Sequence, residues 1–283
     1  MFAKLFKHDF KAVLRFGIPM LIAIGVVAVA GSLNTAFMTS LIARSISEEL
    51  STGYALLSLL SMMLEFVVSL ALIAVPTIIQ VVLLIDYYKS TVSDEAYLTF
   101  TLPVTPTQVL CSKLVNSIVW SLIMFGASAL AGGIIAGFSS LATQSMLPPE
   151  MNDAELGIED IFGIAKAELV LLVALVILYL VITIIVTQLM YFMAISFSSS
   201  ISKKNKALGA IGFAFLANFV YGIINYIILI VAVLIGVFTG VVSESPLLAI
   251  NIAFGVMNVV SIGLGVLFFF LTRQLLTKKL NLA

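Results

Sequence analysis

The sequence predicts an all-α protein that crosses a membrane six times, and three observations support this fold class. Hydrophobic residues make up 62% and charged residues 10% of the 283-residue chain, whereas a soluble domain has roughly 25% charged residues. Apolar runs of about 20 residues or more recur, and each is long enough to cross the hydrocarbon core of a bilayer. The basic residues, finally, gather in alternate loops between these runs.

Six apolar runs form the predicted spans. The second is longer than a perpendicular crossing requires at about 1.5 Å per residue, so it must tilt, kink at Pro76 or extend beyond the bilayer. The third contains Gly133 and Gly137, a spacing that permits close contact between helices. The spans are predicted over residues 16–40, 54–85, 109–141, 169–195, 207–238 and 247–271.

Residues 1–15 are predicted to form an amphipathic helix ahead of the six-span region, residues 16–283. Phe2, Phe6 and Phe10 fall on one side of this helix, and the basic residues fall on the other. This pattern is typical of a helix that lies in the headgroup plane with its basic side towards anionic lipid. The single histidine, His8, and the single cysteine, Cys111, predict neither a metal site nor an intramolecular disulfide.

The charge distribution predicts the topology. With six spans, twelve of the 14 basic residues lie on one side of the membrane and two, Arg44 and Lys166, on the other. The positive-inside rule then places both termini and the loops 86–113 and 196–206 in the cytoplasm, and the acidic loop 143–166 outside. The twelve are Lys4, Lys7, Lys11, Arg15, Lys89, Lys113, Lys203, Lys204, Lys206, Arg273, Lys278 and Lys279.

Local helix signals distinguish the loop 86–113 from a passive connection. Ser93 can cap a short helix whose first turn holds two carboxylates, Asp94 and Glu95. Leu102-Pro103 ends that helix, because a residue before proline is disfavoured in the α region. Thr105-Pro106-Thr107-Gln108 then has the pattern of a capping box at the start of the third span. The simpler interpretation is a well-capped, solvated turn with interfacial aromatic residues.

The sequence gives no sign of catalysis. The phosphate-binding pattern G-x-x-x-x-G-K-[ST] is missing, so ATP hydrolysis by that route is not expected. One histidine and one cysteine exclude metalloprotease and thiol-protease constellations. The serines near Ser198 do not follow a nucleophile-elbow pattern. The chain is therefore not predicted to be an enzyme, to hold a cofactor or metal of its own, or to bind nucleic acid.

Some polar residues fall inside the predicted spans. Glu65 is the main ionisable one, and an intramembrane carboxylate indicates function unless it is hydrated at the interface. Polar rows also mark the fifth and sixth spans, and either a substrate path or hydrogen bonds between helices explains them. The candidates for a translocation pathway are Glu65, Asn218, Tyr221, Asn225 and Asn258.

The chain resembles the membrane subunits (permeases) of bacterial ATP-binding-cassette exporters of the type 2 class. The resemblance covers the layout of the whole chain and is sharpest over residues 94–113. Many bacterial members read acidic-Gly-Tyr-Leu, then Leu-Pro-Val/Ile-Ser, then a lysine that opens the third span. The matching residues here are Asp94-Glu95-Ala96-Tyr97-Leu98, Leu102-Pro103-Val104-Thr105 and Lys113, with Ala96 in place of the glycine and Thr105 in place of the serine.

This resemblance implies a cytoplasmic coupling helix, residues 94–102, that docks on a separate ATPase subunit carrying ATP and Mg²⁺. It further implies a dimer with a second permease copy or a paralogue in a bacterial plasma membrane. This dimer would export an amphipathic or hydrophobic substrate, such as a peptide, lipid or drug-like molecule. The residues expected to couple the chain to the ATPase are Tyr87, Tyr88, Asp94, Glu95, Tyr97, Leu98, Phe100, Leu102, Lys203 and Lys204.

Two other classes compete with this interpretation. One is a membrane sensor or immunity protein that binds a peptide or lipid and signals through the same loop without transport. The other is a channel or secondary transporter, which the scarcity of intramembrane charge and the lack of a visible internal repeat disfavour.

Overall fold

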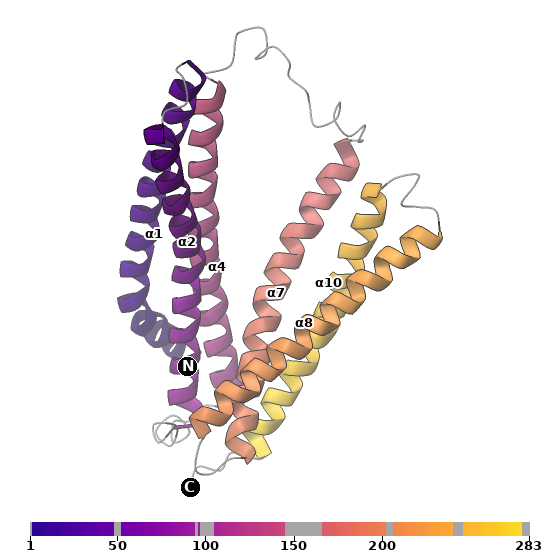
Figure 1. Ribbon diagram of the computed structural model, residues 1–283. Coiled ribbons are helices and arrows are strands. Elements are labelled where there is room, and N and C mark those ends of the chain that lie inside the picture. The colour runs from indigo at the N-terminus through magenta and orange to yellow at the C-terminus, as the bar shows by residue number, and fades with distance from the viewer. Residues whose placement is uncertain are drawn as a thin grey trace. The chain divides into compact units, whose positions relative to one another are not determined.

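The computed structural model shows an all-helical chain (Figure 1) and describes residues 2–47, 52–93, 96, 105–144, 166–201, 206–239 and 246–278. Six of the helices in this part of the chain are long and apolar enough to cross a membrane, which confirms the predicted number of spans. Their bounds are α1, Phe2–Ser47; α2, Thr52–Thr91; α4, Pro106–Gln144; α7, Lys166–Ile201; α8, Lys206–Phe238; and α10, Pro246–Lys278.

Each helix is longer than the span predicted inside it. The shortest two have 33 residues, which corresponds to about 50 Å of helix against about 30 Å of hydrocarbon. Pro19 and Pro76 lie inside α1 and α2 without ending either helix. Helix α1 is continuous from Phe2, so residues 2–15 belong to the same helix as the first span. The position of this segment in the headgroup plane stays a prediction.

The chain divides into two compact units. Unit 1 comprises Met1–Asp9, Leu83–Ile118 and Leu156–Ala283, and unit 2 comprises Phe10–Val82 and Val119–Glu155. Helices α7, α8 and α10 therefore belong to unit 1. Helices α1, α2 and α4 each contribute one end to unit 1 and the rest to unit 2.

In unit 1, α7 and α10 pack as parallel helices along a regular seam. The Nδ2 atoms of Asn251 and Asn258 donate to the backbone carbonyls of Glu168 and Leu175, both at 3.3 Å. The two asparagines are seven residues apart on α10, and the two carbonyls are seven residues apart on α7. Seven residues are about two helical turns, so both contacts lie on the same face of each helix. One step further along α10, a Cβ on Gly265 would lie 3.1 Å from Val186, so the backbone of α10 approaches α7 closely here.

In unit 2, two glycines of α1 allow the other helices to approach. A Cβ on Gly31 would lie 2.5 Å from Ile135 Cδ1 and 2.9 Å from Val68 Cγ1, so α2 and α4 both contact α1 at this point. A Cβ on Gly17 would overlap the indole ring of Trp120, which is 1% exposed. Gly133 and Gly137, whose spacing permits close helix contact, meet no other part of the described chain: outside their own helix backbone, no atom lies within 4 Å of a Cβ built at either glycine.

Replacing Gly17 with alanine tests this packing. We expect Gly17→Ala to lower the free energy of unfolding by about 1–3 kcal/mol, because Trp120 is buried and stacked on Phe10, with 5.1 Å between ring centroids, and cannot move freely. Thermal unfolding in detergent, followed by circular dichroism, measures the change. Gly126→Ala is the matched control, since its Cβ meets no atom within 4 Å. Equal unfolding temperatures for the two variants would contradict the packing.

Candidate functional site

Helix α4 begins with the predicted capping box. The backbone N–H of Gln108 donates to Thr105 Oγ1 at 3.3 Å, and the backbone N–H of Thr105 donates to Gln108 Oε1 at 3.1 Å. Pro106 is the first helical residue, where its missing N–H costs no hydrogen bond. The predicted helix start is therefore confirmed, and the loop after α2 enters α4 through a fixed turn.

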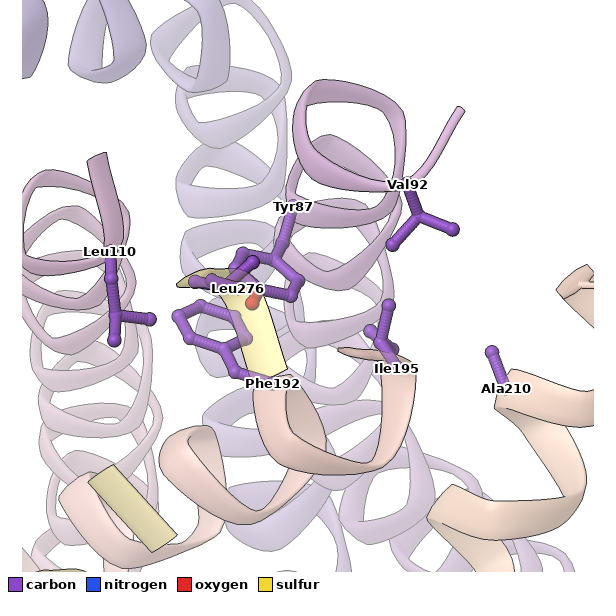
Figure 2. Packing of buried hydrophobic residues seen from close by; sticks show 7 residues of the cluster. All are labelled: Tyr87, Val92, Leu110, Phe192, Ile195, Ala210 and Leu276. Atoms are coloured by element: carbon purple, nitrogen blue, oxygen red, sulfur yellow. The ribbon is translucent and has the colours of Figure 1, made fainter. Parts of the chain in front are cut away.

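A buried cluster joins five helices of unit 1 near their predicted cytoplasmic ends (Figure 2). We call it the aromatic cluster, because Tyr87 and Phe192 lie at its centre. Its members come from the end of α2 and the residue after it, the start of α4, the end of α7, the start of α8 and the end of α10. They are Tyr87, Val92, Leu110, Phe192, Ile195, Ala210 and Leu276. These segments flank both loops predicted to be cytoplasmic.

Tyr87 is the central residue of the aromatic cluster. Its ring lies face to face with Phe192, with 3.9 Å between centroids and 9° between planes (Figure 2). Its hydroxyl forms a hydrogen bond of 2.8 Å with Ser196 Oγ. The residue is 0% exposed, so it links α2 to α7 inside the protein and has no surface left for a second protein. Tyr88, the next residue, is partly buried against the same cluster.

A group of buried charges lies in unit 1 as well, and we call it the Lys113 cluster. Lys113 Nζ on α4 donates to Asp9 Oδ1 of α1 at 2.9 Å and to Asp86 Oδ2 of α2 at 2.6 Å. Ser112 Oγ donates to the second oxygen of Asp9 at 3.1 Å. The side chains of Lys113 and Asp9 are 7% and 6% exposed. One lysine thus connects the first residues of the chain to both ends of the loop 86–113.

The Lys113 cluster fixes geometry more than it adds stability. Removing a charge from water is costly, and the attraction between partners in a buried pair roughly offsets that cost. Removing only one partner is different, because the remaining charges stay buried without compensation. Lys113 neutralises one of two carboxylates and holds them together, so its loss would leave two like charges facing each other.

We therefore expect Lys113→Met to lower the free energy of unfolding by about 3–5 kcal/mol, since Asp9 would remain buried without its ion pair. Lys89→Met on α2 is the matched control, because Lys89 is exposed and a surface lysine contributes about 0–1 kcal/mol. Thermal unfolding in detergent compares the two. If both variants unfold at the same temperature, the Lys113 cluster does not hold these helices together.

Most residues of the predicted coupling segment lie outside the described part of the chain. Inside it, the backbone N–H of Ala96 donates to the carbonyl of Ser93 at 2.8 Å, and Ala96 is 0% exposed. Ala96 is therefore a buried residue shortly after α2 ends. The predicted ATPase-coupling residues that lie outside the described part of the chain are Asp94, Glu95, Tyr97, Leu98, Phe100 and Leu102 of this segment and Lys203 and Lys204 of the loop 196–206.

Glu65 lies in unit 2, half-buried on α2 opposite Asn34 of α1. Asn34 Nδ2 donates to Glu65 Oε2 at 3.1 Å and to the carbonyl of Ser61 at 3.0 Å. Ser61 Oγ donates in turn to Asn34 Oδ1 at 3.2 Å. Glu65 also lines a pocket of about 550 Å³ between α1, α2 and α4. The carboxylate is thus oriented by the amide of Asn34 and borders open space.

The other four pathway candidates lie in unit 1, and three of them form hydrogen bonds between helices. Asn218 donates to Tyr191 Oη at 2.7 Å, and Asn225 Oδ1 accepts from Tyr179 Oη at 3.1 Å. Asn258 belongs to the seam between α7 and α10. The fourth, Tyr221, packs with Ile182, Val186 and Met190 in a second buried cluster. Within unit 1, these four side chains therefore form contacts between helices.

Sequence reasoning missed Asp9, the carboxylate that receives both Lys113 and Ser112. A signal was present, because Asp9 lies on the apolar side of its helix, four residues before the buried Val13. An acid in an apolar stripe requires a partner. That partner is Lys113, the lysine at the start of the third span, and the motif that contains Lys113 does not indicate which carboxylate it binds.

No family model, curated protein or solved structure matches the chain. Among the described residues, no group of three or more histidine, cysteine, aspartate or glutamate side chains is placed to hold a metal ion. The described part of the chain is that of an all-helical, multi-pass membrane protein with a rigidly packed junction of helix ends in unit 1 and a carboxylate-bearing pocket in unit 2.

Proposed function

We propose that the chain is the permease subunit of a bacterial ATP-binding-cassette exporter. The observation that supports this proposal best is the junction of helix ends in unit 1. The aromatic cluster and the Lys113 cluster join the segments on either side of the loop 86–113 to the end of α7 and the start of α8. A force applied to that loop would therefore reach several spans together.

Both ends of the loop are held, as a mechanical link requires. On the α2 side, Val92 and Ala96 are buried. On the α4 side, the capping box at Thr105 fixes the entry into the helix. A short helix at residues 94–102, seated in a groove of an ATPase subunit, would then transmit the closure of that subunit to α2 and α4. Tyr87, which is buried, would then act as an internal link, and Tyr97, Leu98 and Phe100 would contact the ATPase.

The proposed function requires partners. ATP and Mg²⁺ would bind to the separate ATPase, and two permease subunits, identical or related, would form the pathway for an amphipathic or hydrophobic substrate moving outward. Both termini and the loops 86–113 and 196–206 would face the cytoplasm, where the ATPase is available.

Affinity purification tests the proposal. The tagged chain, extracted from its native membrane in detergent, should carry a soluble ATP-binding-cassette ATPase in near-stoichiometric amount. Changing Tyr97 and Leu98 to alanine should remove most of the ATPase, because tyrosine is among the residues that contribute most at the centre of an interface and the loss of Leu98 removes further apolar contact area. A matched control replaces Tyr54 and Leu56, an equivalent pair at the opposite end of α2.

Three results would contradict the permease proposal. The chain could purify without an ATPase, it could retain the ATPase after the change at Tyr97 and Leu98, or it could carry a kinase in place of the ATPase. The last result would support the sensor or immunity interpretation, in which the same junction relays a signal without transport.

A further inference from the structure

The pocket in unit 2 is lined by both polar and apolar side chains. Its volume of about 550 Å³ falls within the range of about 300–1,000 Å³ that small-molecule sites occupy. Glu65, Thr35, Thr39, Ser69 and Ser139 contribute polar atoms, and the other lining residues of α1, α2 and α4 are apolar, among them methionine, leucine, isoleucine and valine. An occupant must therefore be amphipathic.

The carboxylate of Glu65 lacks a positive partner. In the described part of the chain, no lysine, arginine or histidine forms an ion pair with it, and its one hydrogen bond is the 3.1 Å contact from Asn34. A carboxylate accepts about four hydrogen bonds. Asn34 cannot supply more, because its second N–H is bonded to the carbonyl of Ser61. A carboxylate at membrane depth is costly unless it is paired, protonated or hydrated.

Three hydroxyl groups that line the pocket donate their protons to backbone carbonyls of their own helices. Thr35 Oγ1 donates to the carbonyl of Gly31 at 2.9 Å, and Thr39 Oγ1 donates to the carbonyl of Thr35 at 2.8 Å. Ser69 Oγ donates to the carbonyl of Glu65 at 2.8 Å. A hydroxyl has one proton and two lone pairs, so each of these groups offers a ligand only acceptors.

These groups select the charge and the hydrogen-bonding capacity of the ligand. A carboxylate in a pocket with three hydroxyls whose protons are already donated repels anions and offers little to a neutral acceptor. It attracts a cation, and a primary ammonium group supplies three N–H donors that can be shared between the carboxylate and the hydroxyl oxygens. A quaternary ammonium has the charge without the donors. The apolar walls, which include the flexible side chains of Met38 and Met62, accommodate a hydrocarbon or aromatic body of variable shape.

We propose that this pocket binds cationic amphiphiles carrying a primary ammonium group, with the ammonium paired to Glu65. If the chain is the permease proposed above, this ligand class is its substrate class, and that extension rests on the proposed function. Binding itself requires only unit 2 and involves neither ATP nor the loop 86–113.

Dansylcadaverine is a suitable probe, since it joins a primary ammonium to a fluorescent aromatic body. The chain contains one tryptophan, Trp120, which lies on α4 fifteen residues before Ile135 of the pocket wall, about 22 Å along the helix. At this range the indole can transfer excitation energy to a bound dansyl group. The full chain in phosphatidylcholine vesicles should show saturable energy transfer without any ATPase present, above the linear signal of dye dissolved in lipid.

Two variants identify the residue responsible. Glu65→Gln keeps the size of the side chain and removes its charge, and we expect the apparent affinity to fall about tenfold or more, as for the loss of a charged hydrogen bond. Glu168→Gln makes the same chemical change on α7, outside the pocket, and should bind like the original chain. Circular dichroism spectra and thermal unfolding of both variants confirm that they are folded.

A competition series on the unaltered chain keeps the test independent of variant folding. Decylamine should displace the probe, decyltrimethylammonium should do so about tenfold more weakly, and decyl sulfate should not displace it. Three results would each overturn the proposal. They are energy transfer that does not saturate, equal affinity of the Glu65→Gln and Glu168→Gln variants for the probe, and equal displacement of the probe by decylamine and decyltrimethylammonium. None of these results affects the ATPase purification, so failure of the pocket and failure of the permease proposal are distinguishable.

Discussion

The ion pairs of Lys113 are the interaction on which the predicted cytoplasmic end of unit 1 depends. A lysine that is 7% exposed requires carboxylates within reach, and the two that it contacts come from helices distant in sequence. Asp9 fixes the start of α1, and Asp86 fixes the last turns of α2, on either side of the first residues of α4. Because an unpaired charge here is so costly, these three segments keep one relative arrangement.

The aromatic cluster extends this arrangement to the remaining helices of unit 1. Tyr87 follows Asp86 directly, so the residue that stacks on Phe192 is placed by the neighbour that pairs with Lys113. The hydroxyl of Tyr87 then reaches Ser196, near the end of α7. Charge pairing, stacking and one buried hydrogen bond thus connect α1, α2, α4 and α7 at one end, next to the loops 86–113 and 196–206. Such a junction is what a permease driven by an external ATPase would need, and a relay without transport would use it equally.

Unit 2 is packed differently from unit 1. Its helices approach one another through glycines, at Gly17 and Gly31, and they leave space beside Glu65. Unit 1 satisfies its buried charges internally, whereas the Glu65 carboxylate receives one amide donor and borders a pocket in which the hydroxyls of Thr35, Thr39 and Ser69 are already donating. The contrast between a paired lysine and a carboxylate without a cation is the reason for assigning a structural role to one and ligand binding to the other.

The fold class could be predicted from the sequence because membrane spans are long apolar runs, and the helix start at Thr105 could be predicted because a capping box is a local pattern. Contacts between distant segments could not. The residues around Asp9 do not indicate that Lys113 is its partner. From the sequence Tyr87 is an interfacial aromatic residue, and only the structure shows that it stacks on Phe192. Gly133 and Gly137 show that a spacing which permits close contact does not by itself say whether another helix lies there.

Site-specific photocrosslinking at position 97 tests the central claim most directly, namely that the loop joined to this junction contacts an ATPase. Tyr97 would be replaced by benzoylphenylalanine, a photoreactive aromatic residue larger than tyrosine, and cells would be irradiated before the membrane is disrupted. The account predicts a covalent product with a soluble ATP-binding-cassette ATPase, and no such product from the same substitution at Tyr54, at the other end of α2. A product with a kinase or another membrane protein at position 97, or the same ATPase product from both positions, would contradict it.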